Sequence, residues 1–271
     1  LPLRTLEVEF GPSQVEITFD PGVGLTTADD MVLFRSAVKQ IAHRQGLHAT
    51  FMCRPNLPNL FSSGWHLHQS LVNKKTGQNA FIPDTDDEAL SLLGQQFIAG
   101  LLKHARGAAL FSTPTINGYK RYQPYSLAPD RALWGKDNRG AMLRVVGGAG
   151  DPGSRIENRV GEPAANPYLF IASQIAAGLD GLENETSLGP SDDNPYETDH
   201  PMLPSGLAEA LELAATSKLY KAQFGDLFME YYSKLKLAEL VRFQSFLEDN
   251  AIEDDPAVVT EWEQNEYYDF F

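Results

Sequence analysis

Alternating apolar and polar residues open the chain and predict two β-strands. In the segments 6–10 and 15–19, every second residue is Leu, Val, Ile or Phe, and glutamates stand between several of them. A period of two is typical of a strand that buries one face. The Gly-Pro-Ser at 11–13 interrupts the alternation, so the sequence predicts two strand segments separated by a turn or bulge.

Helical spacing replaces this alternation in four later segments. Apolar residues recur every three or four positions from Thr26 or Thr27 to Gly46, and again in 86–106, 166–179 and 207–246, where two or three helices are expected. Further strands are predicted at 47–52, 65–72, 142–146 and 155–160, an irregular segment at 112–140, and a polar connector at 190–204. Strands first and helices later predict an α+β domain with an antiparallel sheet and a helical C-terminal part, about 205–271.

Composition excludes several classes of protein. The 271 residues are 42% hydrophobic and 21% charged, which is enough apolar surface for a folded core. The net charge of −14 disfavours nucleic acid as a partner. The single cysteine, Cys53, fits a reducing compartment, and no apolar run reaches the ~20 residues of a membrane span, so a cytoplasmic protein without a membrane partner is expected. The chain begins with Leu1 inside a strand pattern, and we expect that an N-terminal part is missing.

The predicted strand at 65–72 places chemically useful groups on one face. His66, His68 and Ser70 point one way, while Trp65 and Leu67 point the other. Two imidazoles and a hydroxyl could bind a metal ion or a phosphate. A half-exposed strand with two ordinary surface histidines explains the same pattern equally well.

A second strand shows a sharper pattern of charge. Arg155, Glu157 and Arg159 share one face of the predicted strand at 155–160. A carboxylate between two guanidinium groups could help to hold a divalent cation next to a bound anion. The alternative is a cross-strand ladder of ion pairs without further function.

Two glutamates flank the interruption near the N-terminus. An odd number of positions separates Glu9 from Glu16, which in a regular strand would place the two side chains on opposite faces. A bulge at 11–13 could nevertheless turn both toward one side. Carboxylate oxygens are ligands that Mg²⁺ and Mn²⁺ prefer. The alternative is an edge strand whose charges discourage aggregation, since Glu7 lies there too.

Arginines are concentrated in one part of this acidic chain and predict an anion site. They include Arg121, Arg139, Arg144, Arg155 and Arg159. Together with the glutamates and histidines, they describe a site for divalent cations and a polyphosphate, which phosphoryl transfer requires. The sequence has no Walker loop and no Gly-x-Gly-x-x-Gly, so a P-loop or Rossmann nucleotide site has no support.

Six segments in order resemble the catalytic domain of the glutamine synthetase family. They are Glu-Phe-Gly-Pro-Ser-Gln-Val-Glu (9–16), Ser-Gly-Trp-His-Leu-His-Gln-Ser-Leu (63–71), Asn-Gly-Tyr-Lys-Arg (117–121), Asn-Arg (138–139), Arg-Ile-Glu-Asn-Arg (155–159) and Ala-Ala-Asn-Pro-Tyr-Leu (164–169). The resemblance spans nearly the whole chain. It implies one catalytic domain over 1–271, built as a curved antiparallel sheet backed by helices.

The resemblance also implies roles for individual residues. Glu9 and Glu16 would hold one divalent cation, Mg²⁺ or Mn²⁺, and His66 and Glu157 would contribute to a second. ATP, a co-substrate, would be bound by His68, Ser70, Arg139, Arg144 and Arg155. Arg121, Arg159 and Gly64 would face glutamate, and Arg139 and Arg159 would act in catalysis.

Two parts of the family pattern lie outside this sequence. The family begins with a β-grasp domain, followed by a Glu-x-Glu strand that completes both metal sites. Its active sites lie between the catalytic domain of one subunit and the small domain of a neighbour in a ring. The resemblance therefore implies a ring-shaped homo-oligomer, and a site that this chain alone does not complete.

Three departures from the family pattern bear on the substrates. Leu127 precedes Ala128-Pro129, where ammonia-using members carry a glutamate; Phe61-Ser62 replaces an Asn-Gly that contacts glutamate; and Pro152 replaces a lysine. An isobutyl group at 127 removes a partner for ammonium and favours an apolar neighbour. These changes resemble the branches of the family that join glutamate to organic amines.

The sequence thus predicts an ATP-dependent ligase of nitrogen metabolism. Its substrates would be glutamate and an organic amine, joined as a γ-glutamyl amide through a γ-glutamyl phosphate. One alternative is ordinary glutamine synthesis with ammonia. Another is a scaffold or nucleotide-binding module without catalysis, against which the four ligand-type residues in register argue.

Overall fold

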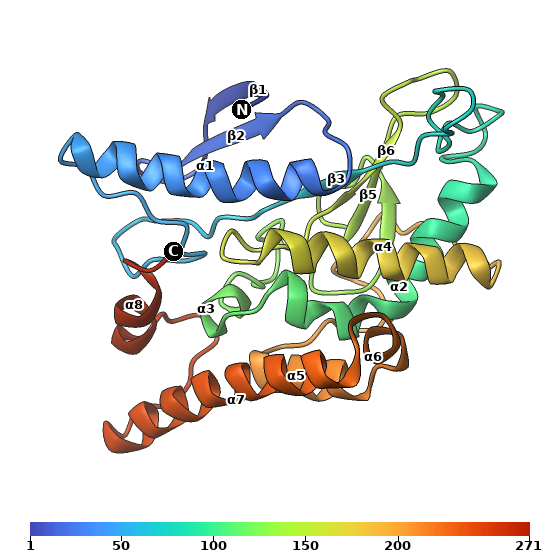
Figure 1. Cartoon of the computed structure of the whole chain (residues 1–271). Helices are drawn as coiled ribbons and strands as arrows, with labels where there is room; N and C mark the ends of the chain where they lie inside the picture. The colour runs from blue at the N-terminus through green and yellow to red at the C-terminus, as the bar shows by residue number, and fades with distance from the viewer.

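The computed structural model describes all residues from Leu1 to Phe271 and contains six strands and eight helices. In chain order they are β1 (Leu3–Val8), β2 (Val15–Phe19), α1 (Leu25–Arg44), β3 (Leu67–Gln69), α2 (Leu92–Ser112), α3 (Ile116–Tyr119), β4 (Trp134–Lys136), β5 (Leu143–Val146), β6 (Arg155–Asn158), α4 (Pro167–Glu183), α5 (Leu207–Thr216), α6 (Lys218–Phe224), α7 (Asp226–Asp249) and α8 (Glu261–Tyr267). Figure 1 shows the β1–β2 hairpin and α1 at one end, α5 to α7 at the other, and α2 and α4 between them.

A four-stranded sheet in the order β3-β6-β5-β4 carries four of the predicted site residues, which are His68, Arg144, Arg155 and Glu157. The β3–β6 and β5–β6 pairs are antiparallel, whereas β4 pairs with β5 in parallel. The predicted α+β class is confirmed, with this one parallel pair added. Because β6 is central, its Glu157 lies opposite His68 on one neighbour and Arg144 on the other.

Helices α2 and α4 pack closely beneath the sheet. A Cβ on Gly100 would lie 2.1 Å from the Ala177 carbonyl oxygen, and one on Gly181 would lie 2.2 Å from the Gln96 carbonyl oxygen. Only glycine allows the two backbones to approach this closely. One apolar core lies between these helices and the sheet, and a second lies between α2 and the C-terminal helices.

The first two strands form a hairpin of their own. Glu7 pairs with Glu16, and the backbone N–H of Glu9 donates to the Gln14 carbonyl, so a tight turn, not a bulge, separates the strands. Glu9 and Glu16 are therefore diagonal neighbours on one face. On the other face Val8 is 91% exposed and Leu6 is 71% exposed.

Several predicted elements differ from those observed. Segment 47–52 forms no strand, so the strand predicted there is wrong, and the strand predicted at 65–72 is reduced to Leu67–Gln69. The helix predicted at 86–106 begins later, because the Ser91 side chain caps it by accepting from the Gly94 N–H. The segment predicted as irregular at 112–140 contains α3 and β4.

The C-terminal aromatic residues pack onto the body of the molecule. Trp262 and Tyr267 contact the second core, and α8 begins with a capping box between Thr260 and Glu263. Phe270 is the exception, because it is 77% exposed. None of the helices combines the length and the hydropathy that a membrane span requires.

Candidate functional site

The carboxylate of Glu157 is the centre of the candidate site. Its Oε1 accepts a hydrogen bond from Arg159 Nη1 at 2.6 Å and lies 3.1 Å from His66 Nδ1. Its Oε2 accepts from Arg144 Nη1 at 3.1 Å. The side chain is 3% exposed. One buried carboxylate on β6 therefore gathers cationic and imidazole groups from β5, β6 and the start of β3.

The surroundings keep Glu157 ionised and His66 neutral. Burial raises the pKa of Glu157, but the His66 hydrogen bond and the Arg159 charge outweigh burial and hold that pKa well below its usual value. Burial lowers the pKa of His66 to about 4, although Glu157 acts in the opposite direction. Imidazole is thus uncharged at neutral pH, which is the form that binds metal ions.

His68 and Arg155 extend the site along the same strands. Arg155 Nε donates to His68 Nδ1 at 3.0 Å, and His68 Nε2 lies 3.8 Å from Glu157 Oε1. Burial lowers the pKa of His68, and Glu157 opposes this effect. Ser70 is exposed just beyond the end of β3. Arg155, His68 and Glu157 therefore form one continuous polar row across β3 and β6.

Arg121 and Arg159 lie side by side below this row. Arg121 Nη2 donates to the Arg159 carbonyl at 2.9 Å, so the backbone fixes the guanidinium in place. A Cβ on Gly64 would lie 2.7 Å from Arg121 Nη2 and 3.0 Å from His66 Nε2, so a side chain there would displace the Arg121 guanidinium. The Nε of Arg159 is buried without a hydrogen-bond partner. An unused donor of this kind fits a bound anion.

Glu9 and Glu16 form a separate carboxylate pair on the hairpin. Burial, the adjacent Glu9 carboxyl and the charges of Glu7 and Glu157 all raise the pKa of Glu16. Neither Glu9 nor Glu16 has a cationic partner, so the pair fits a divalent cation. No three His, Cys, Asp or Glu side chains come close enough together to hold a metal ion, however. The four predicted ligands are thus arranged as two pairs.

Leu127 and Arg139 line one cavity of about 280 Å³. Leu127 adopts a positive φ of 59° and is 47% exposed, so its side chain is not packed into a core. Arg139 makes no hydrogen bond or ion pair, whereas Arg144 is held by Asp137 and Glu157. Arg139 is therefore the free guanidinium of the set.

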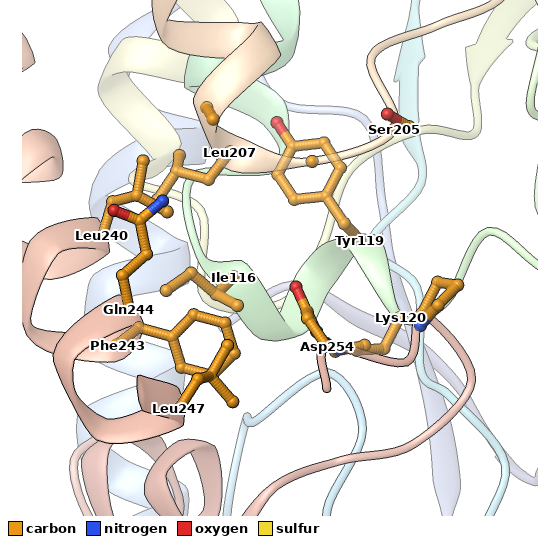
Figure 2. A pocket seen from close by; sticks show the side chains of 13 residues that line it. Ile116, Tyr119, Lys120, Ser205, Leu207, Leu240, Phe243, Gln244, Leu247 and Asp254 are labelled. Atoms are coloured by element: carbon orange, nitrogen blue, oxygen red, sulfur yellow. Dashed lines mark hydrogen bonds and ion pairs between the residues drawn. The ribbon is translucent and has the colours of Figure 1, made fainter. Parts of the chain in front are cut away.

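A second cavity, of about 290 Å³, lies between α3, α5 and α7 (Figure 2). Apolar side chains make up much of its wall, among them Ile116, Leu240 and Phe243. Lys120 Nζ is bound to Asp254 Oδ1 at 2.6 Å and to the Asp255 carbonyl at 2.7 Å. No predicted site residue lines this cavity.

Three residues near the site were missed by the sequence analysis. Asp137 pairs with Arg144, and its place directly before Asn138-Arg139 offered a weak signal. Tyr196 lines the cavity of Leu127 and Arg139, although it belongs to the polar connector and nothing in the sequence marks it. Glu162 is 1% exposed, and a glutamate in loop sequence gives no sign of burial.

Glu162 anchors the short helix that precedes Arg121. Its Oε1 accepts from the Thr115 N–H at 2.8 Å and from Thr115 Oγ1 at 2.9 Å. Thr115 in turn caps α3 through the Gly118 N–H. Burial raises the pKa of Glu162 to about 7, against these hydrogen bonds, which lower it.

The Glu162→Gln variant is expected to gain stability over the wild type as the pH rises. A carboxyl whose pKa is raised by folding stabilises the folded state most at pH values below its ordinary pKa of 4.5. This stabilisation is lost as the pH rises through about 7. The rise of the Glu162 pKa from 4.5 to about 7 corresponds to about 3 kcal/mol at most. Urea unfolding of both proteins at about pH 5 and about pH 8 measures the difference. Glu212→Gln on the exposed face of α5 is the control, and a Glu162→Gln difference independent of pH would refute this account.

Comparison with known proteins matches nearly the whole chain to one family model. The family model "Glutamine synthetase, catalytic domain" matches residues 1–254. A γ-glutamylanilide synthase of Acinetobacter sp is 52% identical over 271 residues, covering 99% of this chain and 54% of that protein. A glutamine synthetase of Pyrococcus furiosus is 37% identical over 274 residues, covering 98% of this chain and 61% of that protein.

Solved structures agree with these sequence matches. A GmaS–ADP complex superposes with a TM-score of 0.81 and 30% identity, covering 97% of this chain and 59% of that one. The fold is therefore shared over nearly all of the 271 residues. The chain spans between about half and three fifths of the length of the proteins that it matches.

Proposed function

Because the chain belongs to the glutamine synthetase family, we propose that it is the catalytic part of an ATP-dependent ligase that joins the glutamate γ-carboxylate to an organic amine. The observation that carries this proposal is that Leu127 and the unpaired Arg139 line the same cavity. An apolar side chain thus stands beside a guanidinium that is free to bind phosphate. The 52% identical relative, a γ-glutamylanilide synthase, supports the same class of product.

The reaction consists of two balanced steps. A glutamate γ-carboxylate oxygen attacks the γ-phosphorus of ATP, ADP leaves, and a γ-glutamyl phosphate forms. The amine nitrogen then attacks the acyl carbon, inorganic phosphate leaves, and the nitrogen loses a proton. Both steps develop negative charge on phosphoryl oxygens, which fixed cationic groups stabilise.

In the proposal, the arginines supply the positive charge that stabilises these phosphoryl oxygens. Arg139, Arg144 and Arg155 contact ATP phosphates, with His68 and Ser70 at the nucleotide, and Arg139 and Arg159 act on the reacting groups. Arg121 and Arg159 orient the glutamate, for which Gly64 leaves room. The fixed position of Arg121 on backbone carbonyls supports an orienting role, since its guanidinium loses little freedom when a carboxylate binds.

Divalent metal ions belong to the same proposal. Glu9 and Glu16 would hold one ion, Mg²⁺ or Mn²⁺, and His66 and Glu157 would contribute to a second. The ions would neutralise phosphate charge when bound. The unpaired, mutually repelling carboxyls of Glu9 and Glu16 support this assignment.

The wider organisation is also a proposal. Residues 1–271 form one catalytic domain, with its helical part at about 205–271, and the protein assembles as a ring-shaped homo-oligomer in the cytoplasm. Leu6 and Val8 are exposed apolar residues on the outer face of the hairpin. Their exposure supports the proposal that another subunit covers this face.

Organic amines are expected to support faster phosphate release than ammonium. Ammonium needs a charged or hydrogen-bonding partner to lose its water, and Leu127 provides none, whereas an alkyl or aryl group gains from burial. The test uses the full-length gene product with ATP, glutamate and a series of ammonium, methylamine, a longer alkylamine, a polyamine and aniline. Clear preference for ammonium would instead favour glutamine synthesis, to which the 37% identical relative corresponds. No release with any of them would favour a scaffold.

The Leu127→Glu variant provides the converse test. A carboxylate at this position supplies a partner for ammonium and an acceptor for its proton, so the ratio of ammonium to organic-amine turnover is expected to rise about tenfold. Leu127→Met, which keeps an apolar side chain of similar volume, is the matched control. An unchanged ratio in Leu127→Glu would show that Leu127 is only a loop residue.

A further inference from the structure

We infer that Tyr125 and Tyr196 form an aromatic wall of the amine site that selects a planar arylamine, an inference that rests on the proposed function. Both rings line the cavity of Leu127 and Arg139, which has a volume of about 280 Å³. A water molecule occupies ~30 Å³ in the liquid, so this cavity is far larger than ammonium requires. It has room for a ring attached to the reacting nitrogen.

The two tyrosines contact each other and expose carbon surface to the cavity. Their ring centroids lie 5.1 Å apart at an interplanar angle of 47°. The Tyr125 hydroxyl donates to Glu197 Oε1 at 3.2 Å. The Tyr196 hydroxyl is buried and points to the Leu127 backbone. What Tyr196 presents to the cavity is therefore its ring, not its hydroxyl.

The wall is fixed relative to Arg139. The connector that carries Tyr196 is held to the 138–140 turn, because Asn138 Nδ2 donates to the Asp193 carbonyl at 3.1 Å. A Cβ on Gly140 would lie 2.7 Å from Pro195 Cγ and 3.1 Å from Tyr196 Cε2. Glycine at 140 thus lets the Tyr196 ring pack against the turn next to Arg139. An arylamine packed against the Tyr196 ring would hold its nitrogen at a defined distance from the Arg139 guanidinium, which we propose binds phosphate.

This arrangement favours an arylamine over a charged alkylamine. Tyrosine rings attract another aromatic ring in tilted or offset geometry. An arylamine is a weak base and is uncharged at neutral pH, so its nitrogen can attack without first losing a proton to a carboxylate at position 127. Of the two carboxylates at the rim, Glu197 already accepts from Tyr125, and Asp193 lies on the exposed connector.

The test compares amine selectivity in wild type and tyrosine variants of the full-length gene product. The value of kcat/KM is measured from phosphate release with aniline, methylamine and a linear diamine. Tyr196→Ala is expected to lower the aniline-to-methylamine ratio about tenfold, with glutamate and ATP KM values unchanged. Tyr196→Phe, which keeps the ring, should retain the ratio. Tyr125→Ala, at a residue that is 69% exposed, should lower it without loss of folding.

Tyr231→Ala is the matched control, because Tyr231 is a 61% exposed tyrosine on α7, remote from the cavity. The inference fails if the ratio is unchanged in both alanine variants, or if Tyr196→Phe behaves like Tyr196→Ala. It also fails if the wild type prefers the diamine to aniline. By contrast, if none of the amines supported phosphate release by the wild type, the proposed function itself would be refuted.

Discussion

The Arg139→Ala variant is expected to lose about two orders of magnitude in kcat with ATP while its melting temperature stays unchanged. Arg139 is exposed and makes no hydrogen bond or ion pair, so its removal leaves no group unpaired in the fold. Removing one preorganised donor from a developing negative charge typically costs 10²–10³ in kcat. The measurement is steady-state phosphate release by the full-length gene product, together with thermal unfolding.

The contrast with two other arginines makes this prediction specific. Arg44→Ala, at the exposed end of α1, removes the same side chain far from the site and should change neither quantity. Arg144→Ala should lower both, because Arg144 is ion-paired with Glu157 and Asp137. If Arg139→Ala retained wild-type kinetics, Arg139 would have no role in phosphate transfer.

The elements that the sequence predicted well are those whose own residues define them. The alternation in 15–19 and the helical spacing before Gly46 correspond to β2 and α1, which contact each other through the rings of Phe19 and Phe34. The prediction of a strand at 47–52 was wrong because this segment makes its contacts with distant residues. The Thr50 hydroxyl, for example, donates to the Tyr268 carbonyl, 218 positions away. No local pattern contains that information.

The residues of the candidate site also divide into those that the sequence predicted and those that it could not predict. The alternation of Arg155, Glu157 and Arg159 placed three charges on one face of a strand. In the structure Arg159 contacts Glu157 directly, whereas Arg155 reaches it only through His68. The register that sets His68 and Arg144 opposite Glu157 could not be read from the sequence, because it depends on how three strands align. Tyr196 could not be found either, since its position comes from the contact of the connector with Gly140.

The Glu157→Gln variant is expected to lose about 3–5 kcal/mol of unfolding free energy, the typical cost of removing one partner of a buried ion pair. Arg144 and Arg159 would each lose a charged acceptor at 3.1 and 2.6 Å. Glutamine has nearly the same volume, so the loss is electrostatic and not a matter of packing. Urea unfolding near neutral pH measures it, and Mg²⁺ or Mn²⁺ should raise the melting temperature less than in the wild type.

The pH dependence distinguishes this effect from a general loss of structure. Because the folded-state pKa of Glu157 is depressed, its stabilisation is present above the ordinary value of 4.5 and is lost as the pH falls below that value. The difference between Glu157→Gln and wild type should therefore shrink in acid. Glu7→Gln is the control: Glu7 faces Glu16 across the hairpin, so its neutralisation removes a like-charge contact and should be neutral or slightly stabilising. A Glu157→Gln protein as stable as wild type at neutral pH would mean that the two arginines do not depend on this carboxylate.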